Sequence, residues 1–414
     1  MPKKIAFISL PVIIAILATA TIIEKFFGTE AALTQIYHSW WFVALWGICA
    51  VMSMFVIVRL RRALPLPTFL VHISFLLILA GAFTSFLSSK RGFVHIRQGE
   101  ILNYFLIEDE NGETTRESLP FNVKLLMFSK TPLTNEDVKE AGGQTRNDGK
   151  KQKGDFFSYL QIDGKTCCVW LNHIYKYKNY RFYQYEYDSD EMGVTLLVNR
   201  DPYGIAITYA GYLLLLASAL WLLWKKRIPV GARHTLSLLP VIAAPTALVW
   251  FFISQIKPMT PVLRSPMLAA HVSVILVSYV LLLVIAILSI IALIRKPKQP
   301  NSSSSILHSS IPHSSFFIIN STLLYPAVFL LAIGIFIGAV WANISWGRYW
   351  GWDAKETWAL ITLLVYALPL HRTSLPVFRS ARRFHWYCVL AFFTILMTFF
   401  GVSYFLGGIH SYVN

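Results

Sequence analysis

Four histidines of this sequence lie in or beside long apolar runs, where an ionisable side chain is costly and needs a partner or a task. His72 lies about one turn inside its run, and His371 ends another run that returns to the same side of a membrane. His271 opens a run at the opposite side, and His410 follows the last run there. The order of the runs therefore predicts two histidine pairs, one at each face.

Two facing imidazoles are the donor set that a haem iron takes at its axial positions, and a porphyrin fills the space between helices. The pairs His72–His371 and His271–His410 thus predict two bis-histidine haem sites. A proton relay would use the same residue type, but it normally needs carboxylates at membrane depth, and none stands out there. For a single histidine, hydrogen-bonded packing is the commoner role, so the prediction depends on the pairing by depth.

Residues 341–358 lie between two apolar runs and are too aromatic and too polar to span a membrane. We call this segment the tryptophan loop. Its indole side chains belong to Trp341, Trp346, Trp350, Trp352 and Trp358. Such indoles at a membrane face suit a large planar ligand, and an interfacial aromatic belt is the alternative. Arg348 and Lys355 could pair with the propionates of haem, or they are ordinary interfacial charges.

Asp353 followed by Glu356 has the pattern of a capping box, in which two carboxylates accept the first unpaired amides of a helix. The pattern predicts a helix from Ala354 to about Leu370. Its length of roughly 25 Å is close to the thickness of a hydrocarbon core. The capping role also accounts for both acidic side chains.

Other histidines have surroundings that favour structural or solvated roles. They lie at span boundaries, in basic loops or in the polar middle of the chain: His38, His95, His173, His234 and His385. We expect none of them to bind a ligand.

The composition excludes a soluble globular protein, since 55% of the 414 residues are hydrophobic and the mean hydropathy is +0.53. The net charge of +16 could indicate a nucleic-acid partner. However, the basic residues cluster in short loops beside apolar runs, which is the positive-inside pattern. We therefore expect a multi-pass membrane protein that binds no nucleic acid.

Apolar runs predict a polytopic α-helical membrane protein with about nine transmembrane helices. They lie at about 5–23, 41–58, 68–88, 204–224, 236–256, 267–294, 322–342, 354–371 and 384–406. The first run is too long for a signal peptide and lacks a convincing cleavage site, so we expect it to be retained. The basic loops then all fall on one side. This predicts a cytoplasmic N-terminus, with the tryptophan loop and the C-terminus outside a bacterial cytoplasmic membrane.

One stretch, residues 89–201, is polar with strand-like alternation and turn signals, and predicts a mostly β extracytoplasmic domain. It would divide the chain into six parts: helices in 1–88, the β domain in 89–201, a fourth helix in 202–228, further helices in 229–296, a Ser-rich cytoplasmic linker in 297–316 and a core in 317–414. The adjacent Cys167 and Cys168 are expected to be strand residues. No Cys-x-x-Cys-His motif occurs, so we do not expect the chain to attach haem to itself.

The tryptophan-loop sequence Trp346-Gly-Arg-Tyr-Trp-Gly-Trp-Asp353, followed by Lys355-Glu-Thr-Trp-Ala-Leu360, resembles the WWD signature of haem-handling proteins of cytochrome c biogenesis. Leu370-His371-Arg372 and Ile409-His-Ser-Tyr412 resemble the CcsA/ResC branch, over about residues 205–414. The run beginning Val71-His-Ile-Ser-Phe and the β domain resemble CcsB/ResB. The chain is thus similar to a natural CcsB–CcsA fusion of system II.

This resemblance implies a membrane haem exporter and holocytochrome c synthase of the haem lyase type, which forms thioethers between haem b and the Cys-x-x-Cys-His cysteines of apocytochrome c. By the same resemblance, His72 and His371 would be axial ligands within the membrane, and His271 and His410 the outer ligands. Trp346, Trp350, Trp352 and Asp353 would present haem for catalysis, with Trp341, Arg348 and Trp358 completing its site. Two departures stand out: Ala354 replaces a usual proline, which a first helical turn tolerates, and the β domain is short.

Partners follow from the same hypothesis. Thioether formation needs free thiols, so we expect a thiol-reducing, thioredoxin-like partner besides haem, apocytochrome c and membrane lipid. A haem transporter or chaperone that forms no bond is one alternative, and a transmembrane di-haem electron-transfer cytochrome is another.

Overall fold

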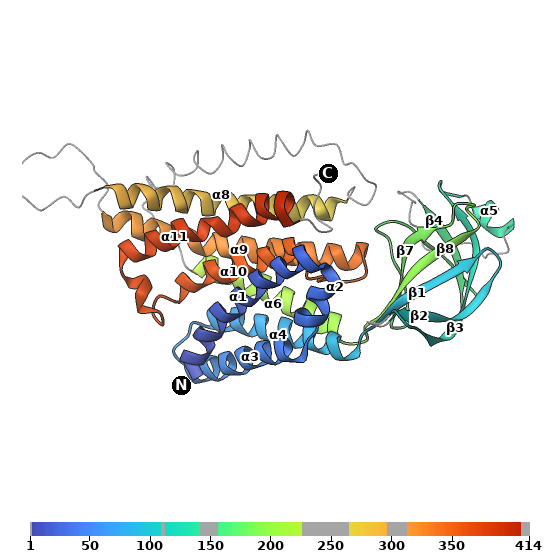
Figure 1. Ribbon diagram of the computed structural model, residues 1–414, viewed down its shortest axis with the longest axis horizontal. Coiled ribbons are helices and arrows are strands. Elements are labelled where there is room, and N and C mark those ends of the chain that lie inside the picture. Colours follow the sequence, from blue (N-terminus) through green and yellow to red (C-terminus); the bar gives the residue numbers. More distant parts are fainter. Residues whose placement is uncertain are drawn as a thin grey trace, which may run out of the picture.

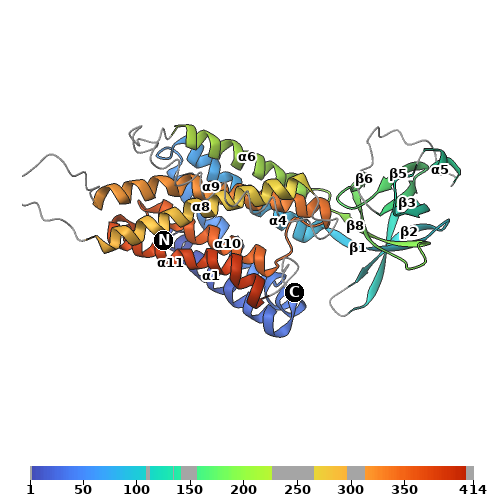
Figure 2. The ribbon, with the colours of Figure 1, turned by 90° about the horizontal axis from the view of Figure 1, so that it is seen from above.

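The computed structural model describes residues 2–108, 112–133, 135–140, 156–225, 265–295 and 313–406. Long helices lie side by side along the molecule, and a β domain lies at one end of them (Figure 1). The view from above shows the same arrangement (Figure 2).

In the described residues, 7 helical segments are long and apolar enough to cross a membrane. They are Lys3–Phe27 in α1, Trp40–Leu60 (α3), Leu66–Ser88 (α4), Gly204–Lys225 (α6), Pro266–Ile294 (α8), Phe316–Ser345 in α9 and Ala381–Leu406, which comprises α11 and a terminal π-helical segment. The full bounds are Pro2–Phe27 for α1, His313–Ser345 for α9 and Ala381–Leu396 for α11. These helices make the chain a multi-pass membrane protein, as predicted.

The predicted count of nine differs from this at two places. The run at 236–256 lies outside the described residues. The run at 354–371 forms α10 (Ala354–Ala367), which has only 14 residues, followed by a 3-10 turn, Leu368–His371. At 1.5 Å per residue α10 covers roughly 21 Å, less than a hydrocarbon core. It packs among the other helices, with Ile361 and Tyr366 almost fully buried.

Helices α4 and α6 lead into and out of the β domain and touch backbone to backbone. A Cβ added to Gly81 would lie 2.6 Å from the Thr208 amide nitrogen, and one added to Gly204 would lie 2.6 Å from that of Ser85. Only small residues allow such close approach of two membrane helices. Ser85 Oγ also donates to Asp201 Oδ2 at 2.5 Å, so the junction is polar as well as tight.

The β domain is a single antiparallel sheet of eight strands in the order β5-β4-β3-β2-β1-β8-β7-β6. The strands are β1 (Lys90–Arg97), β2 (Ile101–Glu108), β3 (Thr114–Ser129), β4 (Phe157–Ile162), β5 (Lys165–Val169), β6 (Tyr175–Tyr177), β7 (Tyr180–Tyr187) and β8 (Gly193–Arg200), with a short helix α5 (Asn135–Glu140) after β3. Alternate residues face one core, where Ile96, Phe105, Leu125 and Phe182 are fully buried. The predicted mostly β domain is thereby confirmed, while its extracytoplasmic location stays a prediction.

Cys167 and Cys168 lie on β5, as expected, and both are buried. Cys167 packs in the main core of the sheet, whereas Cys168 packs with Phe157 and Trp170 in a separate cluster. Neighbouring residues of a strand point to opposite faces, so the two thiols are not placed as a dithiol pair.

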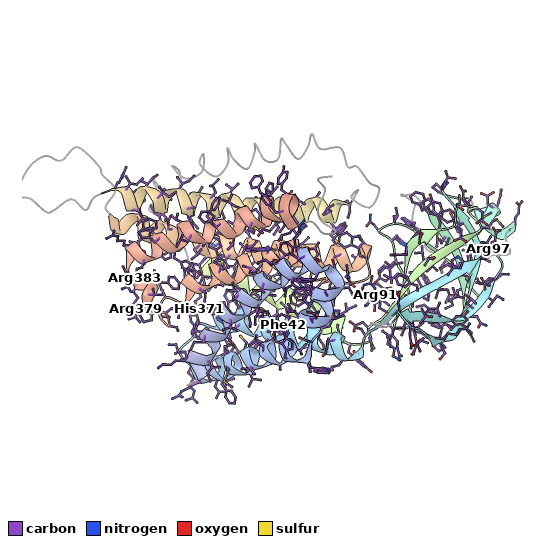
Figure 3. The ribbon with its side chains drawn as sticks, viewed as in Figure 1. Phe42, Arg91, Arg97, His371, Arg379 and Arg383 are labelled. Atoms are coloured by element: carbon purple, nitrogen blue, oxygen red, sulfur yellow. The ribbon has the colours of Figure 1, made fainter. Side chains whose placement is uncertain are left out.

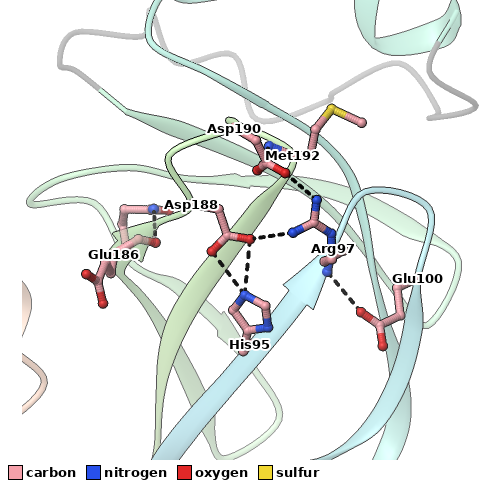
Figure 4. A network of polar contacts seen from close by, with 8 residues as sticks. His95, Arg97, Glu100, Glu186, Asp188, Asp190 and Met192 are labelled. Atoms are coloured by element: carbon pink, nitrogen blue, oxygen red, sulfur yellow. Dashed lines mark hydrogen bonds and ion pairs between the residues drawn. The ribbon is translucent and has the colours of Figure 1, made fainter.

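A network of charges joins β1 to the turn between β7 and β8 (Figure 4). Arg97 donates from Nη1 to Asp188 Oδ2 at 3.0 Å and from Nη2 to Asp190 Oδ2 at 2.5 Å. His95 Nε2 lies 3.0 Å from Asp188 Oδ1. The hydrogen bond from Arg97 holds the pKa of the Asp190 carboxyl below its usual value.

Candidate haem site

His72 and His371 meet in the structure although 299 positions separate them in the sequence. His72 extends from α4 and His371 from the 3-10 turn after α10, and their Nε2 atoms lie 3.5 Å apart. The ring planes are 79° apart, and Phe7 of α1 packs edge-on against His371. His371 lies with Arg379 and Arg383 toward the end of the helices away from the β domain (Figure 3), which we call the basic end.

The second nitrogen of each ring fixes its tautomer. Nδ1 of His72 lies 2.7 Å from the Thr68 carbonyl oxygen, and Nδ1 of His371 lies 2.9 Å from that of Ala367. A carbonyl oxygen only accepts hydrogen bonds, so both Nδ1 atoms must carry a proton. In neutral rings, both Nε2 atoms then present lone pairs to each other.

Such facing lone pairs need a proton or a Lewis acid between them. Histidines that bind metal commonly donate their other ring nitrogen to a backbone carbonyl, which fixes the ring and raises its basicity. The pair has this arrangement on both sides. Its donor set fits an iron with two axial imidazoles.

His271 lies on α8 against α9, where Nδ1 is 2.7 Å from the Gly334 carbonyl oxygen. A Cβ added to Gly338, one turn further along α9, would lie 2.6 Å from His271 Cε1. The missing side chain thus makes room for the imidazole ring, and the carbonyl requires a proton on Nδ1. The predicted partner His410 lies outside the described residues, so the second pair stays a prediction.

The tryptophan loop connects α9 to α10 with two left-handed residues. Gly347 has φ +74°, and Trp352 has φ +58°, a conformation that is strained for a bulky side chain. Trp352 stacks on Tyr37 at 4.7 Å between ring centroids and meets Phe42 edge-on at 5.6 Å. These contacts with the N-terminal helices hold the strained residue in place.

Asp353 caps α10 as predicted, because its Oδ1 accepts from the Glu356 amide at 2.9 Å. The Glu356 carboxylate, however, reaches Gly351, whose amide donates to Oε2 at 2.7 Å. The glutamate therefore closes the loop two residues earlier than in a standard capping box.

The indoles do not form one flat surface. Trp341 and Trp346 are inclined at 67°, and Trp350 and Trp352 at 83°. Trp358 Nε1 donates to Thr21 Oγ1 on α1 at 3.1 Å, so it faces the N-terminal helices. The indole nitrogens of Trp341 and Trp350 are buried and have no hydrogen-bond acceptor in the part of the chain that the structure describes. They are donors that a ligand with carbonyl or carboxylate oxygens would satisfy.

Three hydrogen bonds that no sequence motif predicts hold the tryptophan loop to the β domain. Asn199 Nδ2 donates to the Gly347 carbonyl, Arg91 Nη2 donates to that of Trp346 at 3.4 Å, and Ser345 Oγ donates to Asn172 Oδ1 at 2.5 Å. Polar residues in a polar domain carry no signal that would single these out.

Tyr349 and Arg348 complete the loop. The Tyr349 hydroxyl lies near Ser85 and Thr208 at the junction of α4 and α6, and burial raises its pKa. The Arg348 guanidinium lies over Gly351, where an added Cβ would be 2.9 Å from Arg348 Cζ. Arg348 takes part in none of the ion pairs found among the described residues.

His385 was expected to flank its span and is instead fully buried on α11. Its Nδ1 lies 3.1 Å from Ser289 Oγ and 3.4 Å from Asn320 Nδ2. This polar cluster links α8, α9 and α11, so the structural role expected of His385 is the one its contacts support.

Comparison with known proteins agrees with these features. A family model described as Cytochrome C assembly protein matches residues 205–410, and one described as ResB-like family matches residues 59–210. The two matches meet in α6.

Three relatives are similar over parts of the chain. Protein NrfI of Wolinella succinogenes is 41% identical over 163 residues, which are 39% of this chain and 17% of that protein. Cytochrome c biogenesis protein CcsA of Synechococcus sp. (strain RCC307) is 40% identical over 37% of this chain and 57% of its own length. CcsA of Guillardia theta is 33% identical over 48% of this chain and 71% of its own. The chain thus spans less than two thirds of the first two relatives.

The part matched by the Cytochrome C assembly model contains α8 to α11 and the tryptophan loop. His72 of α4 and the β domain lie in the part matched by the ResB-like model. This chain belongs to the CcsA family of cytochrome c biogenesis proteins, with a ResB-like segment and a cytochrome c assembly segment in one polypeptide.

Proposed function

We propose that this member of the cytochrome c biogenesis family carries haem b across the bacterial cytoplasmic membrane and attaches it to apocytochrome c on the outer side. The observation that carries the proposal is the His72–His371 pair, whose Nε2 atoms face each other at 3.5 Å with both Nδ1 protons bound to carbonyls. This pair would receive haem from the cytoplasmic side. The basic end would face the cytoplasm by the positive-inside rule.

A second haem site would lie at the tryptophan loop, with His271 and His410 as its axial ligands. Supporting it are the buried indole donors of Trp341 and Trp350 and the contacts that join the loop to the β domain. Arg348 and Lys355 are cations that would pair with haem propionates. The β domain would hold the Cys-x-x-Cys-His segment beside the haem.

Thioether formation adds each cysteine S–H across a vinyl C=C of haem, so a C–S bond and a C–H bond form and nothing is oxidised or reduced overall. The chain would contribute orientation, which holds the vinyl groups near the thiols, and exclusion of oxidising solvent. The thiols must be reduced beforehand. A thioredoxin-like partner would supply that step.

The experiment separates bond formation from delivery. The chain is produced with an apocytochrome c in a host without its own maturation genes, and denatured gels are stained for haem. We expect covalent haem on the cytochrome, lost in Trp350→Ala and Trp352→Ala and retained in Trp386→Ala, whose indole is 50% exposed on α11. Membranes loaded with haem but without covalent product, under reducing conditions, would instead indicate a transporter.

A further inference from the structure

A pocket of about 230 Å³ opens at the basic end, beside the His72–His371 pair but outside it. It is lined by Phe317 near the start of α9 and by Arg372, Thr373 and Arg379 from the turns between α10 and α11. Arg372 follows His371 directly in the chain. Both arginine side chains are exposed.

The two guanidinium groups are held in place by neutral neighbours. Arg379 donates from Nη2 to the Thr373 carbonyl at 2.9 Å and from Nε to the Arg372 carbonyl at 3.4 Å. Arg372 Cζ lies 5.7 Å from the centroid of the Phe317 ring, in a cation–π contact. Arg379 still has N–H groups beyond those two bonds, since a guanidinium carries five.

No carboxylate in the described residues neutralises this pair of charges. Neither Arg372 nor Arg379 takes part in an ion pair found among those residues. Two ordered guanidinium groups and the Thr373 hydroxyl form a set of donors suited to an oxyanion, phosphate above all.

Exposed apolar residues close in sequence to the lining residues indicate where such an oxyanion comes from. Ile318 follows Phe317 and is 55% exposed, and Val377 lies in the same turn as Arg379 and is 45% exposed. A free phosphate would make no use of these side chains. A phospholipid would place its acyl chains against them while its phosphate binds the arginines.

We propose that the pocket formed by Phe317, Arg372, Thr373 and Arg379 binds the phosphate of an anionic phospholipid. The site requires no haem and no cytochrome, so it holds whether or not the proposed function does. Binding would also restrain the turn that follows His371.

The test measures binding of phosphatidylglycerol to the purified full chain by native mass spectrometry. Arg372→Gln is the main variant, because it removes one charge and leaves the Arg379 hydrogen bonds in place. Arg372→Gln/Arg379→Gln removes both charges. Arg382→Gln/Arg383→Gln is the matched control, since it removes two exposed arginines of α11 that do not line the pocket.

We expect the double pocket variant to bind phosphatidylglycerol about tenfold more weakly, because charge-assisted hydrogen bonds are lost, and the control to bind as the wild type does. Phosphatidylcholine should bind weakly to the wild type, the double pocket variant and the control variant. The wild-type complex should weaken as salt is raised.

Three outcomes would overturn the proposal. Equal losses in the pocket and control variants would indicate a diffuse basic surface. Displacement of the lipid by soluble glycerol phosphate would indicate a site for free phosphate. Displacement by added haem, with haem loading reduced in the pocket variant and lipid binding unchanged, would assign the arginines to haem carboxylates.

Discussion

The His72–His371 pair and the tryptophan loop are positioned in different ways. The histidine pair is held by its own segments, since each ring bonds to a carbonyl four residues earlier in the same segment. The loop depends on distant parts of the chain, namely Tyr37 and Thr21 near the N-terminus and Asn199 in the β domain. Local contacts therefore orient each histidine ring, whereas the conformation of the loop depends directly on remote segments. This difference is consistent with the roles proposed above, in which the histidine pair receives haem and the loop meets a protein substrate.

The largest effect should follow from removing one member of the histidine pair. We expect His72→Ala and His371→Ala each to reduce haem bound at that site by more than about tenfold, because one of the two proposed axial ligands is lost. Haem per protein after extraction and the visible spectrum of the reduced protein measure this. His95→Ala, which removes an exposed histidine of the β domain, is the control. Bound haem at the control level in both variants would make the pair a packing contact.

The second prediction concerns direction. Haem that enters at the His72–His371 pair should fail to reach the tryptophan loop in His72→Ala, whereas His271→Ala and His410→Ala should leave the first pair loaded. Spectra of the single variants, compared with the double variant His72→Ala/His271→Ala, measure this. If haem is lost only at the mutated site, the two sites fill independently. That result would favour the alternative hypothesis of a transmembrane di-haem electron-transfer cytochrome.

Removing a contact between the tryptophan loop and the β domain should have a smaller effect than removing a histidine. Asn199→Ala leaves the buried Gly347 carbonyl without this donor, at a cost of about 1–3 kcal/mol to that contact. We expect cytochrome c maturation to fall severalfold while the spectrum of the His72–His371 pair is unchanged. Lys124→Ala, at a half-buried position of β3, is the control. A change in the spectrum of the histidine pair would show that the two regions are less independent than their contacts indicate.

The smallest effect concerns the charge network of the β domain. The pKa of Asp190 is lowered from 3.8, mainly by the hydrogen bond from Arg97. Because the folded-state pKa is the lower one, the stabilisation is present above pH 3.8 and is lost as the pH falls through the folded value. Thermal melting of the β domain in the full chain should therefore show a slight loss at acid pH that is absent in Asp190→Asn. An identical pH profile in that variant would assign the loss to other carboxyls.

The sequence predicted features that depend on local spacing or on the order of the spans. Asp353 caps α10, and His72 meets His371, because turn patterns and span order leave few alternatives. It did not predict that Glu356 would bond to Gly351 or that Asn199 would reach the loop. Those contacts depend on the position of the β domain relative to the helices, and no periodicity in the sequence predicts this position.

The length of α10 was also overestimated. Its apolar run extends to His371, but Pro369 follows the last α-helical residues and removes a backbone donor, and the chain tightens into a 3-10 turn. That turn is what directs His371 toward α4.

The close junction of α4 and α6 has a mechanical consequence. The β domain is joined to the membrane helices through α4 and α6, whose backbones touch at Gly81 and Gly204. Ser85 at this junction and His72 belong to the same helix, at roughly 20 Å from each other along its axis. Helix α4 thus connects the β domain directly to the His72–His371 pair. A polypeptide that pulled on the β domain would therefore exert force on the same helix that carries His72.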